Sequence, residues 1–438
     1  MSNKDEELEK ILNEFKTEDI KASPEPEPEN DEAKAAQAPK AEPAADAYAA
    51  RAARLSAQED NLPEAYKQTE KQEKGKSKII IIVIAVVAVI AIACAAGFGL
   101  FSGGKEEEPS TDAPTEPPVI TTEAPAPVST NNPLTGEADY NAMAVGLRPI
   151  AVVVDNASGA RPQYNLDAAD IVVEGEVEGG ETRMLWLFSD MTDLPELLGP
   201  TRSARPSYVQ FSELFDAIFI HFGGSHSKGD YVGGYEVIAA DNVDDIDGMK
   251  TSACFKRTSD KHSPHNAALL GNKLIDVIES KGYRTKLDQN SFADLSFNES
   301  VIPVSSTACS GATVKFSSRT RSHTFAYNEA EKVYTNQSDY GTPVRFTNVI
   351  VMFAQSEYIV KYDYKQQGKN ETYLNYSLTS GTGKLLSCGT EVDFTWSVDN
   401  GKLSFKDTAG NQLDLNPGKS YLALVSSNNG GSVLVNAE

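Results

Sequence analysis

One apolar run in the chain is far longer than any other. Residues 79–101 (IIIIVIAVVAVIAIACAAGFGLF) contain no charged side chain over 23 positions. As a helix rising about 1.5 Å per residue, this run matches a bilayer hydrocarbon core of about 30 Å. Because buried helices of soluble proteins rarely stay apolar all round for so long, the run predicts a single transmembrane helix.

The basic residues that flank this run predict its orientation. Five lysines lie between residues 67 and 78, whereas Lys105 is the only Lys or Arg between residues 101 and 146. Positively charged flanks stay on the cytoplasmic side. We therefore predict a single-pass protein of the cell membrane, with its N-terminus in the cytoplasm and its C-terminal part extracytoplasmic.

Polar segments precede and follow the predicted span. Residues 21–78 are rich in Ala, Glu, Pro and Gln, a composition that favours a disordered cytoplasmic segment, and residues 102–130 form a Pro/Thr/Glu-rich linker. Within residues 1–20, Leu8, Ile11, Leu12 and Phe15 share one face of an amphipathic helix. Residues 5–20 are thus either a docking helix for a cytoplasmic partner or an inert, weakly helical terminus.

Residues 131–300 show an alternation of strand and helix patterns. Apolar strands are predicted at 148–156, 170–177, 182–190 and 216–222, and helices from Pro206 onward and across 263–283. This alternation predicts an α/β or α+β domain.

Residues 301–438 carry strand patterns only, separated by turn signals such as Asp399-Asn400-Gly401 and Pro417-Gly418. They predict an antiparallel, β-rich domain.

Charge and cysteine content narrow the function classes. Residues 131–438 hold 26 Lys and Arg against 38 Asp and Glu, a net charge of −12 within the −23 of the whole chain. Such an acidic region is unsuited to nucleic acid, which we exclude as a partner. Three cysteines follow the predicted span, so either Cys309 and Cys388 form a bridge or all three, Cys254 included, are buried thiols.

Arginines gather in glycine-containing loops near predicted strand ends. Arg161 lies in SGARPQ, Arg183 in EGGETR, and Arg202 with Arg205 in GPTRSARP. Arginine binds carboxylate or phosphate through two parallel N–H groups, and amides at the start of the helix after residue 205 add affinity for anions. The alternative is that these arginines and Arg148 pair internally with the carboxylates Asp155, Asp170, Glu174 and Glu178.

Four of the five histidines also lie in this region, at His221, His226, His262 and His265. Neither HExxH nor a Cys/His metal spacing accompanies them, so we predict no metal and no cofactor. Ser225 with His265 would suit a catalytic triad, yet the GxSxG turn that exposes such a serine is missing.

An ordered set of motifs over residues 131–435 resembles one known family. NPLTGE, RPIAVVVDN, ARPQYNL, GPTRSARPSYV, FDAIFIHFGGS and SPHN occur in the order found in the YerB-like envelope proteins, whose domain of unknown function, DUF3048, has an N-terminal and a C-terminal part. The resemblance implies a membrane-attached, wall-facing protein of Gram-positive bacteria without a settled activity. The polar positions that match the family are Asp155, Asn156, Arg161, Gln163, Asp170, Glu178, Thr182, Arg183, Arg202, Ser203, Arg205, His221, Ser225, His265 and Asn266.

These observations give two functional hypotheses. In the first, an Arg/His-lined cleft binds an anionic cell-wall component or an envelope protein outside the cell. In the second, an envelope hydrolase or transferase uses His265 or His221 as a base, with Arg202 and Arg205 stabilising an oxyanion. The candidate ligand-binding residues are Asp155, Arg161, Glu178, Arg183, Arg202, Ser203, Arg205, His221, Ser225, His265 and Asn266.

Overall fold

The computed structural model of the protein describes residues 130–363 and 368–437. Within these ranges, no helix is both long enough and apolar enough to cross a membrane. The predictions for residues 1–20, 21–78, 79–101 and 102–129 concern parts of the chain outside the described ranges.

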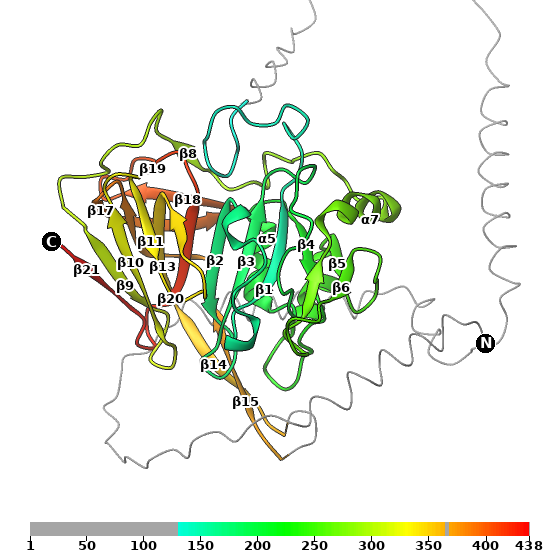
Figure 1. Cartoon of the computed structure of the whole chain (residues 1–438). Coiled ribbons are helices and arrows are strands. Elements are labelled where there is room, and N and C mark those ends of the chain that lie inside the picture. Colours follow the sequence, from blue (N-terminus) through cyan, green and yellow to red (C-terminus); the bar gives the residue numbers. More distant parts are fainter. Residues whose placement is uncertain (1–129, 364–367, 438) are drawn as a thin grey trace, which may run out of the picture. The chain divides into compact units, whose positions relative to one another are not determined.

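A ten-stranded mixed sheet runs through the described region (Figure 1). It combines strands from both sides of residue 300, so the predicted domain boundary there does not divide it. Its spatial order is β18 (Lys402–Asp407), β17 (Thr390–Asp399), β16 (Ser380–Ser387), β13 (Asn348–Ala354), β20 (Ser420–Ser426), β2 (Ile171–Glu176), β3 (Thr182–Phe188), β1 (Ile150–Asp155), β4 (Ile218–His221) and β5 (Asp245–Asp247).

Strand β20 joins the two halves of this sheet. It runs parallel to β2 on one side, with Val172 opposite Tyr421, and parallel to β13 on the other. The prediction of a β-rich second half is confirmed, but its purely antiparallel arrangement is wrong at this strand. All seven residues of β20 are buried, which is typical of a parallel strand covered on both faces.

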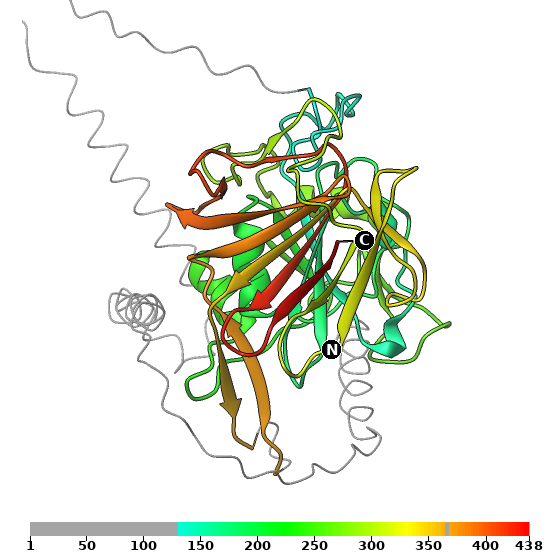
Figure 2. The same cartoon turned by 90° about the vertical axis from the view of Figure 1, so that its left-hand side faces the viewer.

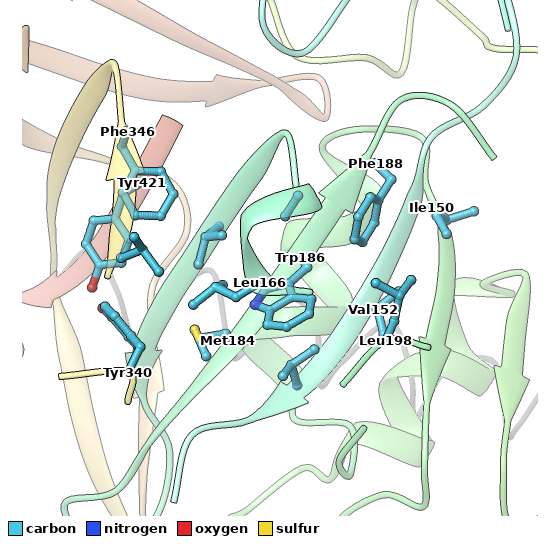
Figure 3. Close-up of a cluster of buried hydrophobic side chains, with 14 of the residues drawn as sticks. Ile150, Val152, Leu166, Met184, Trp186, Phe188, Leu198, Tyr340, Phe346 and Tyr421 are labelled. Carbon is cyan, nitrogen blue, oxygen red and sulfur yellow. The ribbon is translucent and has the colours of Figure 1, made fainter. Parts of the chain in front are cut away.

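A second, five-stranded sheet covers part of one face of the large sheet (Figure 2). Its order is β12 (Val344–Phe346), β11 (Val333–Asn336), β10 (Ser322–Asn328), β9 (Gly311–Lys315) and β21 (Ser432–Asn436). Trp186 and Tyr421 of the large sheet share one core with Phe346 and Tyr340 from the side of the small sheet, as Figure 3 shows. Burial of these large rings holds the segments before and after residue 300 together.

The opposite face of the large sheet packs against two short helices, α5 (Pro206–Glu213) and α6 (Gly234–Asp241). Helix α5 starts at Pro206, as predicted, because proline suits the first helical turn. Tyr208, Val209 and Phe211 of α5 enter a second core together with Trp396.

The helix predicted across 263–283 is wrong in its first half. Only α7 (Leu274–Lys281) is an α-helix, preceded by the 3-10 turn η4 (Gly271–Lys273). Residues Ala267–Leu269 instead form the strand β7, which pairs with β6 (Phe255–Arg257). Because all three residues of β7 are buried between neighbouring strands, tertiary pairing overrides the helical preference of alanine and leucine.

Smaller elements complete the fold. The hairpin of β14 (Ser356–Lys361) and β15 (Glu371–Tyr376) projects from the main body (Figure 1). A short parallel pair joins β8 (Ser296–Phe297) to β19 (Asp414–Leu415), and the 3-10 turns η2 (Ser158–Ala160) and η3 (Leu166–Ala168) follow β1. Cys254, Cys309 and Cys388 are free thiols, Cys388 being only partly buried.

Candidate anion-binding site

The loops that carry the predicted arginines meet at one edge of the large sheet. Strand β1 ends at Asp155, which lies opposite Arg183 near the start of β3. The segment from Gly199 to Arg205 crosses this edge: the Arg202 N–H donates to the Val153 carbonyl, and the Asp155 N–H donates to the Pro200 carbonyl. These backbone bonds place Arg202 and Arg205 beside strand ends, as the sequence suggested.

Two arginines share the carboxylate of Glu178, which follows β2. The Arg183 Nη2 group donates to Glu178 Oε1 over 2.9 Å, and Arg205 Nε donates to Oε2 over 2.8 Å. A further contact joins Arg205 Nη2 to Oε1. Both arginines also donate to the carbonyl of Ser203, whose own hydroxyl donates to the Phe222 carbonyl.

Asp155 holds the other half of the cluster. Its Oδ2 lies 2.8 Å from His265 Nδ1 and 3.2 Å from Arg202 Nε. Burial alone would raise the pKa of Asp155, but His265 and Arg202 outweigh it and lower that pKa to about 2. The side chain of Asp155 is buried, whereas those of Arg202 and His265 are 26% and 27% exposed. The exposed part of the cluster is therefore formed by Arg202 and His265, together with Glu178.

The cluster has an excess of positive charge. Three guanidinium groups, those of Arg183, Arg202 and Arg205, face the two carboxylates of Asp155 and Glu178. Burial and the nearby Arg205 charge lower the pKa of Arg183 to about 10, although Glu178 opposes this shift. Like charges crowded in this way are a favourable environment for an additional anion.

Arg202 is the member with unused donors. Its guanidinium lies close to Asp155 but makes no hydrogen bond to any residue within the described ranges, and its Nε is buried. By contrast, Arg183 and Arg205 use their donors on Glu178 and on backbone carbonyls. Arg202 can therefore present the outer edge of its guanidinium to an incoming carboxylate or phosphate.

A set of side chains that the sequence did not suggest lies behind Arg205. The Lys361 Nζ atom lies 4.3 Å from the ring centre of Tyr231 and 4.5 Å from that of Tyr373, and the Arg205 guanidinium contacts the Tyr373 ring. Burial and the Arg205 charge lower the pKa of Lys361 to about 8. A cavity of about 10 Å³ beside Arg205 and these tyrosines has room for roughly one water molecule.

Two of the candidate residues lie apart from the cluster. His221 is fully buried: its Nδ1 contacts the Gly223 carbonyl over 2.6 Å and its Nε2 contacts Asp245 over 3.1 Å. Ser225 is buried and bonds to Tyr231, while it accepts the Gly234 N–H. Neither residue reaches His265 through a hydrogen bond within the described ranges, so the Ser225/His265 pair does not form.

Arg161 and Asn266 belong to neighbouring networks. Arg161 Nε donates to Asn156 Oδ1 over 3.1 Å, and Asn156 in turn donates to Glu174. Asn266 accepts from Arg257 and donates to the Thr258 carbonyl. These hydrogen bonds connect Arg161 and Asn266 to side chains outside the cluster.

The internal pairing considered in the sequence analysis is found in part. Asp155 and Glu178 do pair with arginines, and Arg148 is held by Asp216 and Asp244. Glu174 instead pairs with His323 of β10, and Asp170 accepts hydrogen bonds from Ser189. Glu174 and His323 are far apart in sequence, so no local pattern could indicate their contact.

In the part of the chain that the structure describes, no group of three or more metal-binding side chains occurs.

Comparison with known proteins identifies the family. Residues 134–284 match the DUF3048 N-terminal domain and residues 312–422 match the DUF3048 C-terminal domain, both described as of unknown function. The Bacillus subtilis (strain 168) protein named "Putative lipoprotein YerB" is 31% identical over 290 residues, which is 64% of this chain and 81% of that protein. The crystal structure of YerB from Bacillus subtilis aligns with a TM-score of 0.56 at 27% identity and covers 69% of this chain and 99% of that chain. Since the two domain matches span more than half of the sequence, the chain belongs to the DUF3048 family, as its motifs suggested.

Proposed function

We propose that this chain is a membrane-anchored, wall-facing envelope protein that binds an anionic cell-wall component through the cluster of Arg183, Arg202, Arg205, Asp155 and Glu178, with His265 at its exposed side. The apolar run 79–101 would supply the anchor. The lipoprotein name of the YerB relative supports an envelope location. In the cytoplasm, residues 5–20 would dock to a partner through their apolar face.

The unused donors of Arg202 carry this proposal. Arg202 is about a quarter exposed and lies in a cluster with more guanidinium groups than carboxylates, and its guanidinium makes no hydrogen bond within the described ranges. Residues 131–438 as a whole are acidic, with a net charge of −12, so the surface around the positively charged cluster repels anions. Such a site favours an anionic group presented singly at the cluster over a polyanion spread across the surface.

One observation supports the alternative function, that of a hydrolase or transferase. His265 is held by Asp155 through Nδ1, the arrangement that orients a general base in acyl-transfer enzymes. His221 does not suit this role because it is fully buried with both ring nitrogens in contact with oxygens. In this alternative His265 would be the base and Arg202 the group that stabilises negative charge.

Binding to wall material tests the proposal. Full-length protein in detergent is incubated with purified cell walls, either intact or stripped of their anionic polymers by acid. The bound fraction is then measured for the wild type and for Arg202→Gln. We expect binding to fall at least about tenfold in the variant, since losing a charge-assisted bidentate contact costs about 1.5–3 kcal/mol.

The matched control is Arg345→Gln, which removes an arginine that is 61% exposed and already paired with Glu331. It should bind walls like the wild type. Equal retention of wild type and Arg202→Gln on intact walls would refute the proposed site. Loss of binding on stripped walls would assign the ligand to the anionic polymers rather than to peptidoglycan carboxylates.

A further inference from the structure

The protonation of His265 can be deduced from its contact with Asp155. The carboxylate of Asp155 is buried and lies next to Arg202, and it stays ionised because its pKa is lowered to about 2. An ionised carboxylate can only accept hydrogen bonds, so His265 Nδ1, which lies 2.8 Å away, must carry the proton. In the neutral ring, Nε2 is then a hydrogen-bond acceptor.

This acceptor is held in place and unused. His265 Nε2 makes no hydrogen bond to a residue of the described ranges. The ring packs against Gly159, where an added Cβ would come within 2.9 Å of the His265 Cδ2 atom. The contact of Nδ1 with Asp155 and the close approach of Gly159 to the ring both restrict its rotation.

Arg202 and His265 contact the same oxygen atom of Asp155. Arg202 Nε and His265 Nδ1 both approach Oδ2 of Asp155, at 3.2 and 2.8 Å. The two side chains are exposed to nearly equal extents. The exposed side of the cluster thus offers cationic N–H donors from Arg202 beside the His265 ring, whose Nε2 is the nitrogen turned away from Asp155.

We propose that the anionic group recognised here carries a neighbouring hydroxyl: Arg202 holds the anionic oxygens and His265 Nε2 accepts the hydroxyl hydrogen. This inference rests on the proposed function and specifies its ligand as a hydroxylated anion. Two wall sources share this chemistry, namely polyol phosphate polymers and hydroxylated carboxylates of sugars. A bare anion would leave the His265 acceptor without a partner.

Paired probes that differ only in hydroxyl groups test the inference. Affinities for glycerol 3-phosphate and propyl phosphate, and for lactate and propionate, are measured by calorimetry on the full-length protein in detergent at pH 8. We expect the hydroxylated member of at least one pair to bind about three- to tenfold more tightly, the effect of one net hydrogen bond. The pair with the larger preference identifies the source.

Two variants separate this inference from the proposed function. His265→Phe should abolish the preference within a pair while Arg202 still holds the anion, and Arg202→Gln should weaken both members of a pair. The control is His226→Phe, because His226 is 67% exposed and contacts the Glu236 carboxylate and the Tyr235 ring, neither of which belongs to the cluster. Equal affinities within both pairs for the wild type overturn the hydroxyl inference alone. Failure of all four probes to bind overturns the proposed anion site as well.

Discussion

At the scale of single residues, Glu178 is the counter-charge of two arginines, because its one carboxylate pairs with both Arg183 and Arg205. Burial would raise the pKa of Glu178, but the charges of Arg183 and Arg205 lower it to about 2. About a quarter of its side chain is exposed, so solvent reaches the cluster there. Glu178 is therefore both the counter-charge that makes the cluster stable and a competitor of any incoming anion.

Replacing Glu178 by Gln should destabilise the protein by about 2–4 kcal/mol, because two poorly solvated guanidinium groups lose their counter-charge. A carboxyl group with a lowered pKa stabilises the fold above its unfolded pKa, near 4.5, and this contribution is lost as pH falls toward about 2. Hence the stability of the wild type should fall between these pH values more steeply than that of the variant.

Intrinsic fluorescence during thermal unfolding measures this effect, since both tryptophans of the chain, Trp186 and Trp396, are buried in the large sheet. Glu299→Gln, at an exposed position, is the control and should leave both the melting temperature and its pH dependence unchanged. Parallel pH curves for the wild type and Glu178→Gln would contradict the assigned role of Glu178.

Residue identity alone indicated the members of the cluster but not their pairing. The sequence placed Arg183, Arg202 and Arg205 near strand ends, and the structure brings them together. The partner of Arg202 is Asp155, which His265 also contacts. A carboxylate shared by a loop arginine and a histidine 110 positions away is set by tertiary structure, on which local spacing carries no information.

At the scale of elements, the turn between β2 and β3 positions Glu178. The Glu181 N–H donates to the Glu178 carbonyl, and Gly179 and Gly180 both have positive φ, at 63° and 82°. Two such residues in succession are typical of the tight turns that favour a strongly twisted hairpin. The EGGE segment between the predicted strands 170–177 and 182–190 thus forms a tight turn, and its two glycines suit the positive φ angles of that turn.

The two glycines should differ in their tolerance of alanine. At Gly179 an added Cβ meets nothing within 4 Å, so Gly179→Ala should cost only the backbone strain of about 1–2 kcal/mol. At Gly180 the Cβ would lie 2.8 Å from the Arg319 carbonyl oxygen, so Gly180→Ala should cost about 1–3 kcal/mol more. Each variant serves as the reference for the other in thermal unfolding, and equal losses would contradict the predicted clash.

Strands were predicted more reliably from the sequence than the helix before α7. The apolar runs at β1, β2 and β3 have no competing pattern and occur as expected. The segment 263–273 combines helix-forming residues with a location between buried strands, and the strands decide its conformation. The parallel insertion of β20 beside β2 could not be predicted, because paired residues such as Val172 and Tyr421 lie near opposite ends of the described chain.

At the scale of the whole molecule, a buried polar contact joins the two family halves. Glu174 of β2 is fully buried and accepts hydrogen bonds from Tyr340 over 2.7 Å and from Tyr421 over 2.9 Å. His323 Nε2 lies 3.3 Å from its Oε1, while the ring stacks on Tyr340. Asp339 lies 3.6 Å from the other ring nitrogen of His323. These four partners come from the C-terminal half, whereas Asn156 and Thr182 of the N-terminal half also donate to Oε1 of Glu174.

The charges at this contact have opposite pH dependence. Burial would raise the pKa of Glu174, but His323 and the hydroxyl donors lower it to about 2. Burial would lower the pKa of His323, but Glu174 outweighs it and raises that pKa above its usual 6.5. The histidine contribution to stability is therefore complete below pH 6.5 and is lost as pH rises through the raised pKa, whereas the Glu174 contribution is lost as pH falls from 4.5 toward 2.

Replacing His323 by Gln should remove the high-pH loss of stability. At pH 6 the variant should be about 3–5 kcal/mol less stable than the wild type, because it leaves the Glu174 charge buried without its cationic partner. Above pH 6.5 the wild type should lose stability and approach the variant, whose own curve lacks this histidine-dependent fall. Thermal unfolding followed by tryptophan fluorescence from pH 5 to 9 measures both curves.

The control His226→Gln, which changes an exposed histidine, should retain the wild-type dependence of stability on pH. If the gap between wild type and His323→Gln stayed constant across this range, the contact would not depend on protonated His323, and packing alone would hold the halves together.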